Sequence, residues 1–253
     1  VLGKFSQLNI QEYAKDCVKI IDYFKSFWHD DVRYKLIVYI SLATNEDQTG
    51  GTRLNDAFVL GLAQNATLKS GYGLNYLAAH EIFHAWNNPN NYTPTHQHHE
   101  SELYWITEGF TDYYAFESLY RMGLISFSDY LDSYNEILRD YYTSMVNHET
   151  NQAIEKNFWH DYFLEKLPYQ RGNILAHQWN VEILKASNGR YSFDNLMRDI
   201  QGKHFNLEQI NEISKKYLKW GIESDVQKYI INGELIKPFP DTFGKKAQMV
   251  YKK

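Results

Sequence analysis

Two histidines and a glutamate near residue 80 have the types and the spacing of a metal-dependent catalytic site. The segment His80-Glu81-Ile82-Phe83-His84 reads HExxH. Residues four apart lie on the same face of a helix, so the two imidazoles can share one zinc ion. Glu81, beside them, can then act as a general base toward a zinc-bound water. Because so short a motif also arises by chance, HExxH by itself is only a hypothesis.

A third candidate ligand is Glu108, in the segment WITEGFTD at residues 105–112. A catalytic zinc site has three protein ligands and keeps a fourth position open for water. Asp112 follows Glu108 by one helical turn, and we predict that it accepts a hydrogen bond from a ligand histidine and so orients the ring. The alternative for Glu108 is an acid that only stabilises the start of a helix.

The other histidines and the single cysteine do not have the spacing of a second site. His96, His98 and His99 cluster in a polar segment, which predicts exposed loop residues. The isolated histidines are predicted to be packing or surface residues: His148, His160, His177 and His204. Cys17 lies at a helix-spaced apolar position and is predicted to be buried, and one cysteine excludes a disulfide within the chain.

The HExxH residues need a rigid support, and the apolar positions predict a helix over residues 74–86. A glycine-rich break precedes this helix, and a polar loop follows at residues 87–99. Upstream, the pattern predicts a helix over residues 7–28, a buried strand over 34–42, a turn over 49–52 and a second strand over 57–60.

Nearly all of the remaining chain has helical periodicity. The predicted helices span residues 103–121, 127–147, 169–187, 192–201, 207–218 and 223–232. Pro168 predicts a break before one of them, and Pro238 and Pro240 begin an irregular tail. We therefore predict an α+β, mostly α fold: residues 1–90 form a small front lobe with the HExxH helix, residues 91–253 form a helical back lobe, and both make one catalytic unit.

Composition limits the classes of partner. The 253 residues are 43% hydrophobic and 16% aromatic, enough for a sizeable core. The net charge is -5, which argues against nucleic acid as a partner. The sequence has no apolar run of membrane-spanning length. The glycosylation patterns at Asn65 and Asn91 are interpreted as incidental matches.

Several segments together resemble the glycyl aminopeptidase family of zinc peptidases. They are HEIFHAW at residues 80–86, WITEGFTDYY at 105–114 and LYRMGLIS at 119–126. PYQRG at residues 168–172 is similar to the PYxKG element of the wider aminopeptidase clan, and SFDNLMRDI at 192–200 to a late helix of the family. The similarity extends over about residues 50–243.

The resemblance implies a thermolysin-like (gluzincin) domain, in which His80, His84 and Glu108 bind Zn²⁺ and Glu81 is the base. It also places Tyr169 over the metal, where its phenol can donate a hydrogen bond to the developing oxyanion. Apart from the resemblance, Tyr169 would be interpreted as a packing residue. The implied substrate is a peptide or protein, and the implied edge strand, assigned to residues 57–60, can pair with it.

The segment before the catalytic helix departs from the family pattern. Family members typically carry Gly-Gly-Leu-Glu-His, whose glutamate holds a substrate's free amine, whereas this chain has Gly50-Gly51-Thr52-Arg53-Leu54. Gly50 and Gly51 remain candidate substrate-binding residues. Arg53 stands where the family has the glutamate, and an arginine cannot bind an ammonium group. The acid is therefore either replaced by Arg53 or shifted to Asp56. Because neither the family's N-terminal β domain nor its PDZ domain is recognisable, we expect a fragment whose partner domains are missing.

Three alternatives to a peptidase remain open at this stage. The fold could serve a peptide-binding module that does not cleave, or a zinc hydrolase of a non-peptide substrate. A structural protein with a chance HExxH would bind no zinc. The sequence leaves open the substrate preference, exo- or endopeptidase action and the oligomeric state, and we expect an extracytoplasmic location because the family is often exported.

Overall fold

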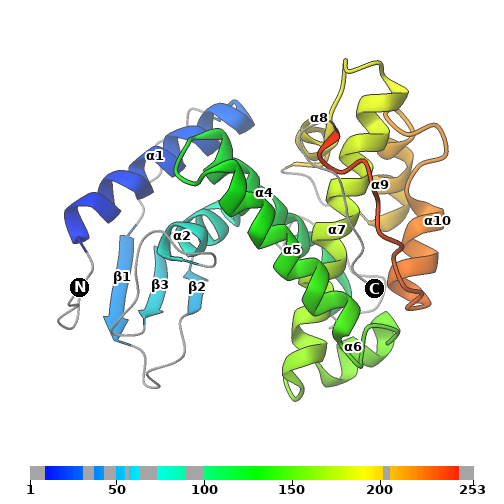
Figure 1. The fold of residues 1–253 in the computed structure, drawn as a ribbon, viewed down its shortest axis with the longest axis horizontal. Helices are drawn as coiled ribbons and strands as arrows, with labels where there is room; N and C mark the ends of the chain where they lie inside the picture. The colour runs from blue at the N-terminus through cyan, green and yellow to red at the C-terminus, as the bar shows by residue number, and fades with distance from the viewer. Residues whose placement is uncertain are drawn as a thin grey trace. The chain divides into compact units, whose positions relative to one another are not determined.

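The computed structural model describes residues 9–30, 37–42, 50–54, 57–62, 73–88, 100–201 and 206–244. Within these ranges the fold is α+β and mostly α, with one small sheet among many helices, as predicted (Figure 1). The elements of the N-terminal part are α1 (Ile10–Trp28), β1 (Ile37–Leu42), β2 (Gly50–Leu54), β3 (Ala57–Leu62) and α2 (Leu74–Phe83). The elements that follow are a 3₁₀ turn (Glu100–Leu103), α3 (Tyr104–Thr107), α4 (Gly109–Arg121), α5 (Phe127–Thr143), α6 (Asn151–Asn157), α7 (Tyr162–Ala186), α8 (Phe193–Ile200), α9 (Leu207–Ser214), α10 (Glu223–Asp225) and a π-helical turn (Val226–Ile231).

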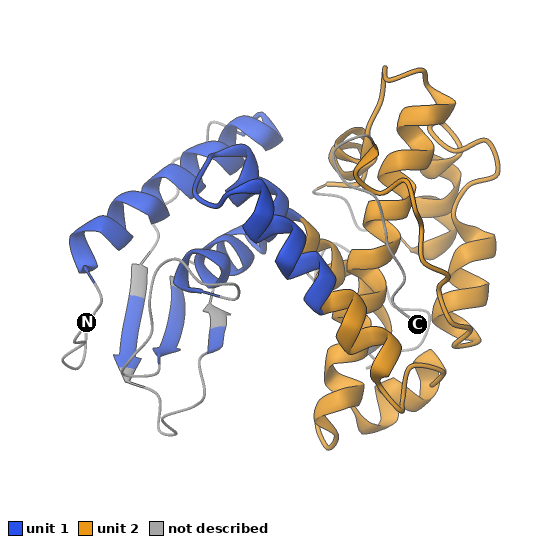
Figure 2. Ribbon diagram, in the orientation of Figure 1, with its two compact units in different colours: residues 1–86, 114–136 blue, residues 87–113, 137–253 orange. Residues whose placement is uncertain are grey.

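The chain divides into two compact units (Figure 2). Unit 1 comprises residues 1–86 and 114–136, and unit 2 comprises residues 87–113 and 137–253. Unit 1 holds the sheet, α1 and α2, and unit 2 holds α3 and the helices from α6 onward. The predicted lobes 1–90 and 91–253 stay a prediction.

The strands of unit 1 form one sheet with the order β1-β3-β2. β1 pairs with β3 in parallel, and β2 pairs with β3 antiparallel. The strand predicted to be an edge, residues 57–60, is therefore the central strand, and that prediction was wrong. The side chains of Phe58, Leu60 and Leu62 are buried, which explains the apolar pattern. As the central strand, β3 has both of its backbone edges paired.

The turn predicted over residues 49–52 was also wrong, since Gly50 and Gly51 open the edge strand β2. Adjacent glycines favour a turn because they lack a side chain to pack. Here Gly51 pairs with Leu60 across the ladder, and pairing with β3 outweighs that local preference. The edge strands of the described sheet are thus β1 and β2, and β3 is not one of them.

Helix α1 supports α2 through an aromatic cluster. Asn9 caps α1 by accepting hydrogen bonds from two backbone N–H groups, and the buried face of α1 includes Cys17, Phe24 and Phe27, as predicted for Cys17. The ring of Phe24 lies 5.1 Å from that of Phe83 on α2, and Phe83 stacks on Tyr114 of α4 at 4.8 Å. These contacts fix α2 from behind, which positions the HExxH segment.

Helix α7 runs through Pro168, so the predicted break at this residue was wrong. The helix begins at Tyr162, where Asp161 accepts hydrogen bonds from two backbone N–H groups, and it continues for 25 residues. A proline inside a helix costs about 3 kcal/mol. Pro168 and much of the helix that follows are buried, and this burial offsets the cost.

The other helices lie close to their predicted ranges. The segment predicted as one helix over residues 103–121 is divided at Glu108 into α3 and α4, and α6 was not predicted. The last predicted helix begins as α10 and continues as the π-helical turn. Each difference arises from a short segment, where local periodicity is weakest.

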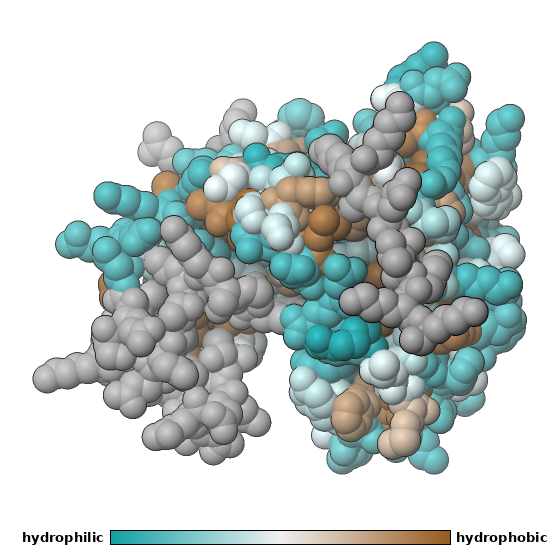
Figure 3. Space-filling model, in the orientation of Figure 1, coloured by the Kyte–Doolittle hydropathy of each residue, from teal (hydrophilic) through white to brown (hydrophobic). Residues whose placement is uncertain are grey.

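Hydrophilic residues predominate over the described surface in the view of Figure 3. None of the helices within the described ranges is both long and apolar enough to cross a membrane. Three exposed aromatic side chains lie close together in the sequence, at Trp159, Tyr162 and Phe163. They surround the start of α7 in unit 2.

Candidate active site

Helix α2 carries the two histidines on one face. The Nε2 atoms of His80 and His84 lie 3.1 Å apart, and the rings meet edge to face at 4.8 Å. Both residues are buried, at 7% and 8% exposure. The opposite side of the helix is held in the core by Ala78, Ala79, Ile82 and Phe83. The sequence spacing thus produces the predicted pair of adjacent imidazoles.

Glu81 lies against the backbone of the edge strand β2. A Cβ atom at Gly51 would come within 2.6 Å of Glu81 Oε1, so a side chain at this position would require the carboxylate to move. The predicted base and the predicted substrate-binding residue Gly51 are therefore neighbours in unit 1. Gly50 is exposed, with open space around it. Arg53 lies in β2, but its side chain is outside the described part. Asp56 is outside the described residues.

Glu108 occupies the break between α3 and α4 in unit 2. The backbone keeps helical hydrogen bonds across the break: Glu108 N donates to Tyr104 O, and Asp112 N donates to Glu108 O, both at 2.8 Å. The carboxylate is thus presented at an irregular point of an otherwise continuous helical segment. Such a break allows a side chain to leave the regular helical direction.

A crossing of two glycines brings this break close to α7. A Cβ atom at Gly109 would lie 2.5 Å from Gly172 Cα, and one at Gly172 would lie 1.9 Å from Trp105 O. No side chain larger than hydrogen fits at either position. The two backbones therefore touch, and Tyr169, one turn before Gly172 on α7, reaches Glu108. This crossing was not predicted, and its signal in the sequence was Gly109 directly after Glu108 and Gly172 three residues after Tyr169.

Tyr169 remains a neutral phenol at physiological pH. Burial raises the pKa of Tyr169 well above its usual value of 10.0, and the negative charges of Glu108 and Asp112 raise it further. Glu108 also accepts a hydrogen bond from the phenol, which stabilises the protonated form. Asp112 is buried in the first turn of α4, and its predicted hydrogen bond with a ligand histidine stays a prediction.

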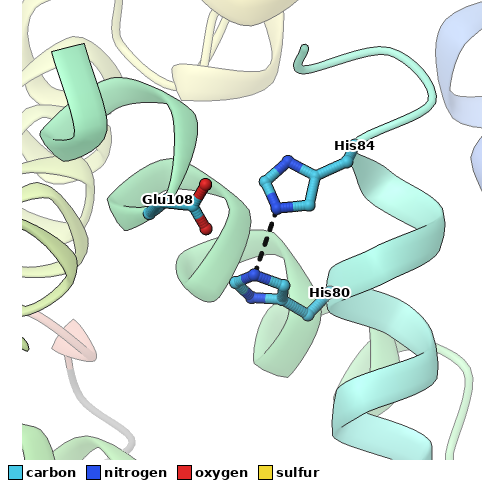
Figure 4. A group of neighbouring side chains, drawn as sticks. All are labelled: His80, His84 and Glu108. Carbon is cyan, nitrogen blue, oxygen red and sulfur yellow. Dashed lines mark hydrogen bonds between the residues drawn. The ribbon is translucent and has the colours of Figure 1, made fainter. Parts of the chain in front are cut away.

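His80, His84 and Glu108 each offer one ligand atom, and these atoms all lie within 4.8 Å of one another (Figure 4). Two nitrogen ligands on tetrahedral zinc are about 3.3 Å apart, given Zn–N distances of about 2.0–2.1 Å. The 3.1 Å between the two imidazole nitrogens is close to this value. Two imidazoles and one carboxylate are also a donor set of catalytic zinc sites. The residues present therefore fit zinc.

No other group of three potential ligands occurs in the part of the chain that the structure describes. His148 and His160 are exposed and His177 is buried, in agreement with their interpretation as surface or packing residues. His96, His98, His99 and His204 lie outside the described residues. The predicted ligand set is thus the one candidate metal site within those ranges.

Comparison with known proteins supports one family. Residues 74–167 match the M61 glycyl aminopeptidases. A comparison with curated proteins found no match.

The fold as a whole is similar to a solved structure, that of an aminopeptidase N family protein from Idiomarina loihiensis. The TM-score is 0.74 at 17% sequence identity, over 95% of this chain and 45% of that one. The chain thus spans less than half the length of this structural relative. Together with the matched segment, which contains HExxH and Glu108, these findings confirm the resemblance to the glycyl aminopeptidase family that the sequence predicted.

Proposed function

We propose that the chain is the catalytic part of a zinc-dependent peptidase. The observation that carries the proposal is the convergence of His80, His84 and Glu108, with ligand atoms within 4.8 Å of one another. Two further placements support it: Glu81 directly follows the first ligand on α2, and Tyr169 touches the third ligand from α7. The match of residues 74–167 to a peptidase family supports the same reaction class.

His80, His84 and Glu108 would hold the ion. Zinc held there would supply Lewis-acid chemistry, which would lower the pKa of water toward neutrality and polarise the scissile carbonyl. Glu81 takes the proton of the attacking water and delivers it to the departing amine. The phenol of Tyr169 donates a hydrogen bond to the oxygen that becomes negative in the transition state.

The placement of Glu81 suggests how a peptide is held. β2 is an edge strand of the described sheet, and Gly51 brings its backbone against the Glu81 carboxylate. An extended peptide that added to β2 would pass beside the proposed base. Substrate pairing at residues 57–60 is ruled out by the central position of β3 in the sheet. Whether the enzyme removes N-terminal residues depends on what stands in for the missing glutamate near Arg53.

Elemental analysis and peptide cleavage on one purified sample test the proposal. We expect one zinc per chain and cleavage of a mixed peptide library, read by mass spectrometry. His84→Ala should lose both, whereas the exposed His148→Ala should keep both. Stepwise loss of N-terminal residues would assign an aminopeptidase, and internal cuts an endopeptidase.

Other outcomes would contradict parts of the proposal. Zinc without cleavage would favour a peptide-binding module or a hydrolase of another substrate, since the same site supports either. A wild-type chain that takes up no zinc after reconstitution would overturn the metal site itself.

A further inference from the structure

The side chain of Asn87 is buried against the break that contains Glu108. Asn87 is 1% exposed, and its Nδ2 atom donates to Ile106 O at 3.0 Å and to Thr107 O at 3.2 Å. The same atom donates to Thr111 Oγ1 at 3.0 Å. All four residues belong to unit 2. One amide thus holds both sides of the break, two carbonyls before Glu108 and one hydroxyl after it.

Thr111 completes this arrangement. Its hydroxyl donates to Thr107 O at 2.5 Å, so its oxygen is free to accept from Asn87. Both Thr107 and Thr111 are fully buried. The last carbonyls of a helix lack partners within it, and α3 ends at Thr107. Asn87 and Thr111 supply hydrogen-bond donors to these last carbonyls, at the point where α3 ends.

We propose that Asn87 is a positioning residue for Glu108, acting with Thr111. Glu108 is the residue between the bonded carbonyls and the bonded hydroxyl, so its backbone is fixed from both sides. A carboxylate on a fixed backbone has fewer conformations to lose when it binds a metal ion. Groups that orient a ligand in this manner are typically worth about 10- to 100-fold in metal affinity. The inference rests on the proposed function only in naming Glu108 as a ligand.

The sequence places Asn87 three residues after His84, directly beyond the segment HEIFHAW. Its amide nitrogen, with two N–H donors, lies within hydrogen-bond distance of three acceptors in the segment around Glu108. Asn87 therefore acts on the metal site through Glu108.

Zinc affinity, measured by competition with a chromophoric chelator, tests the proposal. We expect Asn87→Ala and Thr111→Val to weaken zinc binding by about 10- to 100-fold. The matched control is Asn147→Ala, because Asn147 is also buried and also donates to two successive carbonyls, Tyr141 O and Tyr142 O. This control should leave zinc affinity unchanged even if it lowers the melting temperature.

A double-mutant cycle shows whether the effect passes through Glu108. In a Glu108→Ala background, where two histidines remain, Asn87→Ala should cause no further loss of zinc affinity. Hydrogen exchange of the metal-free protein adds a readout independent of zinc: the amides of Glu108 and Asp112 should exchange faster in Thr111→Val than in wild type.

The outcomes separate this inference from the proposed function. Wild-type protein without zinc affinity would overturn the metal site, whatever the hydrogen exchange shows. Zinc binding by wild type that stays unchanged in Thr111→Val and in folded Asn87→Ala would overturn the positioning role alone. An equal loss with and without Glu108 would do the same, because it would mean a general structural effect.

Discussion

Glu81 and Tyr169 have different proposed tasks, and single substitutions separate them. Glu81→Gln keeps the size of the side chain and removes its basicity. Because Glu81 is not a proposed ligand, we expect zinc content to stay at the wild-type level while kcat falls by about 10²- to 10⁴-fold. Steady-state kinetics and elemental analysis measure both. Glu208→Gln, an exposed acid on α9, is the matched control. A wild-type rate in Glu81→Gln would remove the base from the mechanism.

Tyr169→Phe removes one hydroxyl and leaves the ring. We expect kcat to fall by about 10²- to 10³-fold with little change in KM, because the hydrogen bond is made to charge that appears in the transition state. Tyr162→Phe, exposed on the same helix, should behave like wild type. A rise in KM alone would indicate substrate binding instead.

Among the elements, the contact of α3 and α4 with α7 depends on Gly109 and Gly172. Replacing a helical glycine with alanine usually stabilises a protein by about 0.5–1 kcal/mol. At Gly172 the added Cβ would meet Trp105 O at 1.9 Å, so we expect Gly172→Ala to destabilise the protein by about 1–3 kcal/mol. Urea unfolding monitored by tryptophan fluorescence measures the change. An increase in stability would mean that the two backbones separate without cost.

The same crossing should affect catalysis. Tyr169 lies one turn from Gly172, and Glu108 is next to Gly109, so forcing the helices apart moves the phenol away from the carboxylate. In Gly172→Ala protein that remains folded, the fall in kcat should therefore resemble that of Tyr169→Phe. Zinc content should change less, since the two histidines are on α2 in unit 1.

For the whole molecule, the buried His177 makes stability depend on pH. Its ring packs edge to face on Tyr113 at 4.7 Å and on Phe243 at 5.5 Å, and burial lowers the pKa of His177 to about 3. In the unfolded chain the imidazole of His177 has a pKa near 6.5, so it binds a proton at a pH at which the folded protein does not. Stability is therefore full above about pH 6.5 and falls toward pH 3, at up to about 1.4 kcal/mol per pH unit.

Urea denaturation between pH 4 and pH 7 measures this dependence. His177→Leu should flatten the slope over that window, because leucine cannot bind the proton in either state. The exposed His160→Leu should keep the wild-type slope. If His177→Leu and wild type show equal slopes, other groups dominate the acid sensitivity.

The candidate site was largely predictable because its signals are local. HExxH spacing depends only on the helical repeat, so α2 and the pair His80 and His84 follow from five residues of sequence. The helical character of the remaining chain follows in the same way from apolar periodicity. Glu108 was predicted from its position downstream of HExxH, whereas the assignment of Tyr169 drew on resemblance to a family, whose match over residues 74–167 ends before Tyr169.

Tertiary structure decided what no local pattern records. β3 is central and Gly50-Gly51 is a strand because of pairing between segments, and α7 passes through Pro168 because its surroundings bury it. The roles of Asn87 and of the pair Gly109 and Gly172 likewise appear only when distant segments meet. Residue types and helical spacing determined the chemistry that is available. Long-range packing, whose energy exceeds local propensity, determined how the carboxylate and the phenol are held for it.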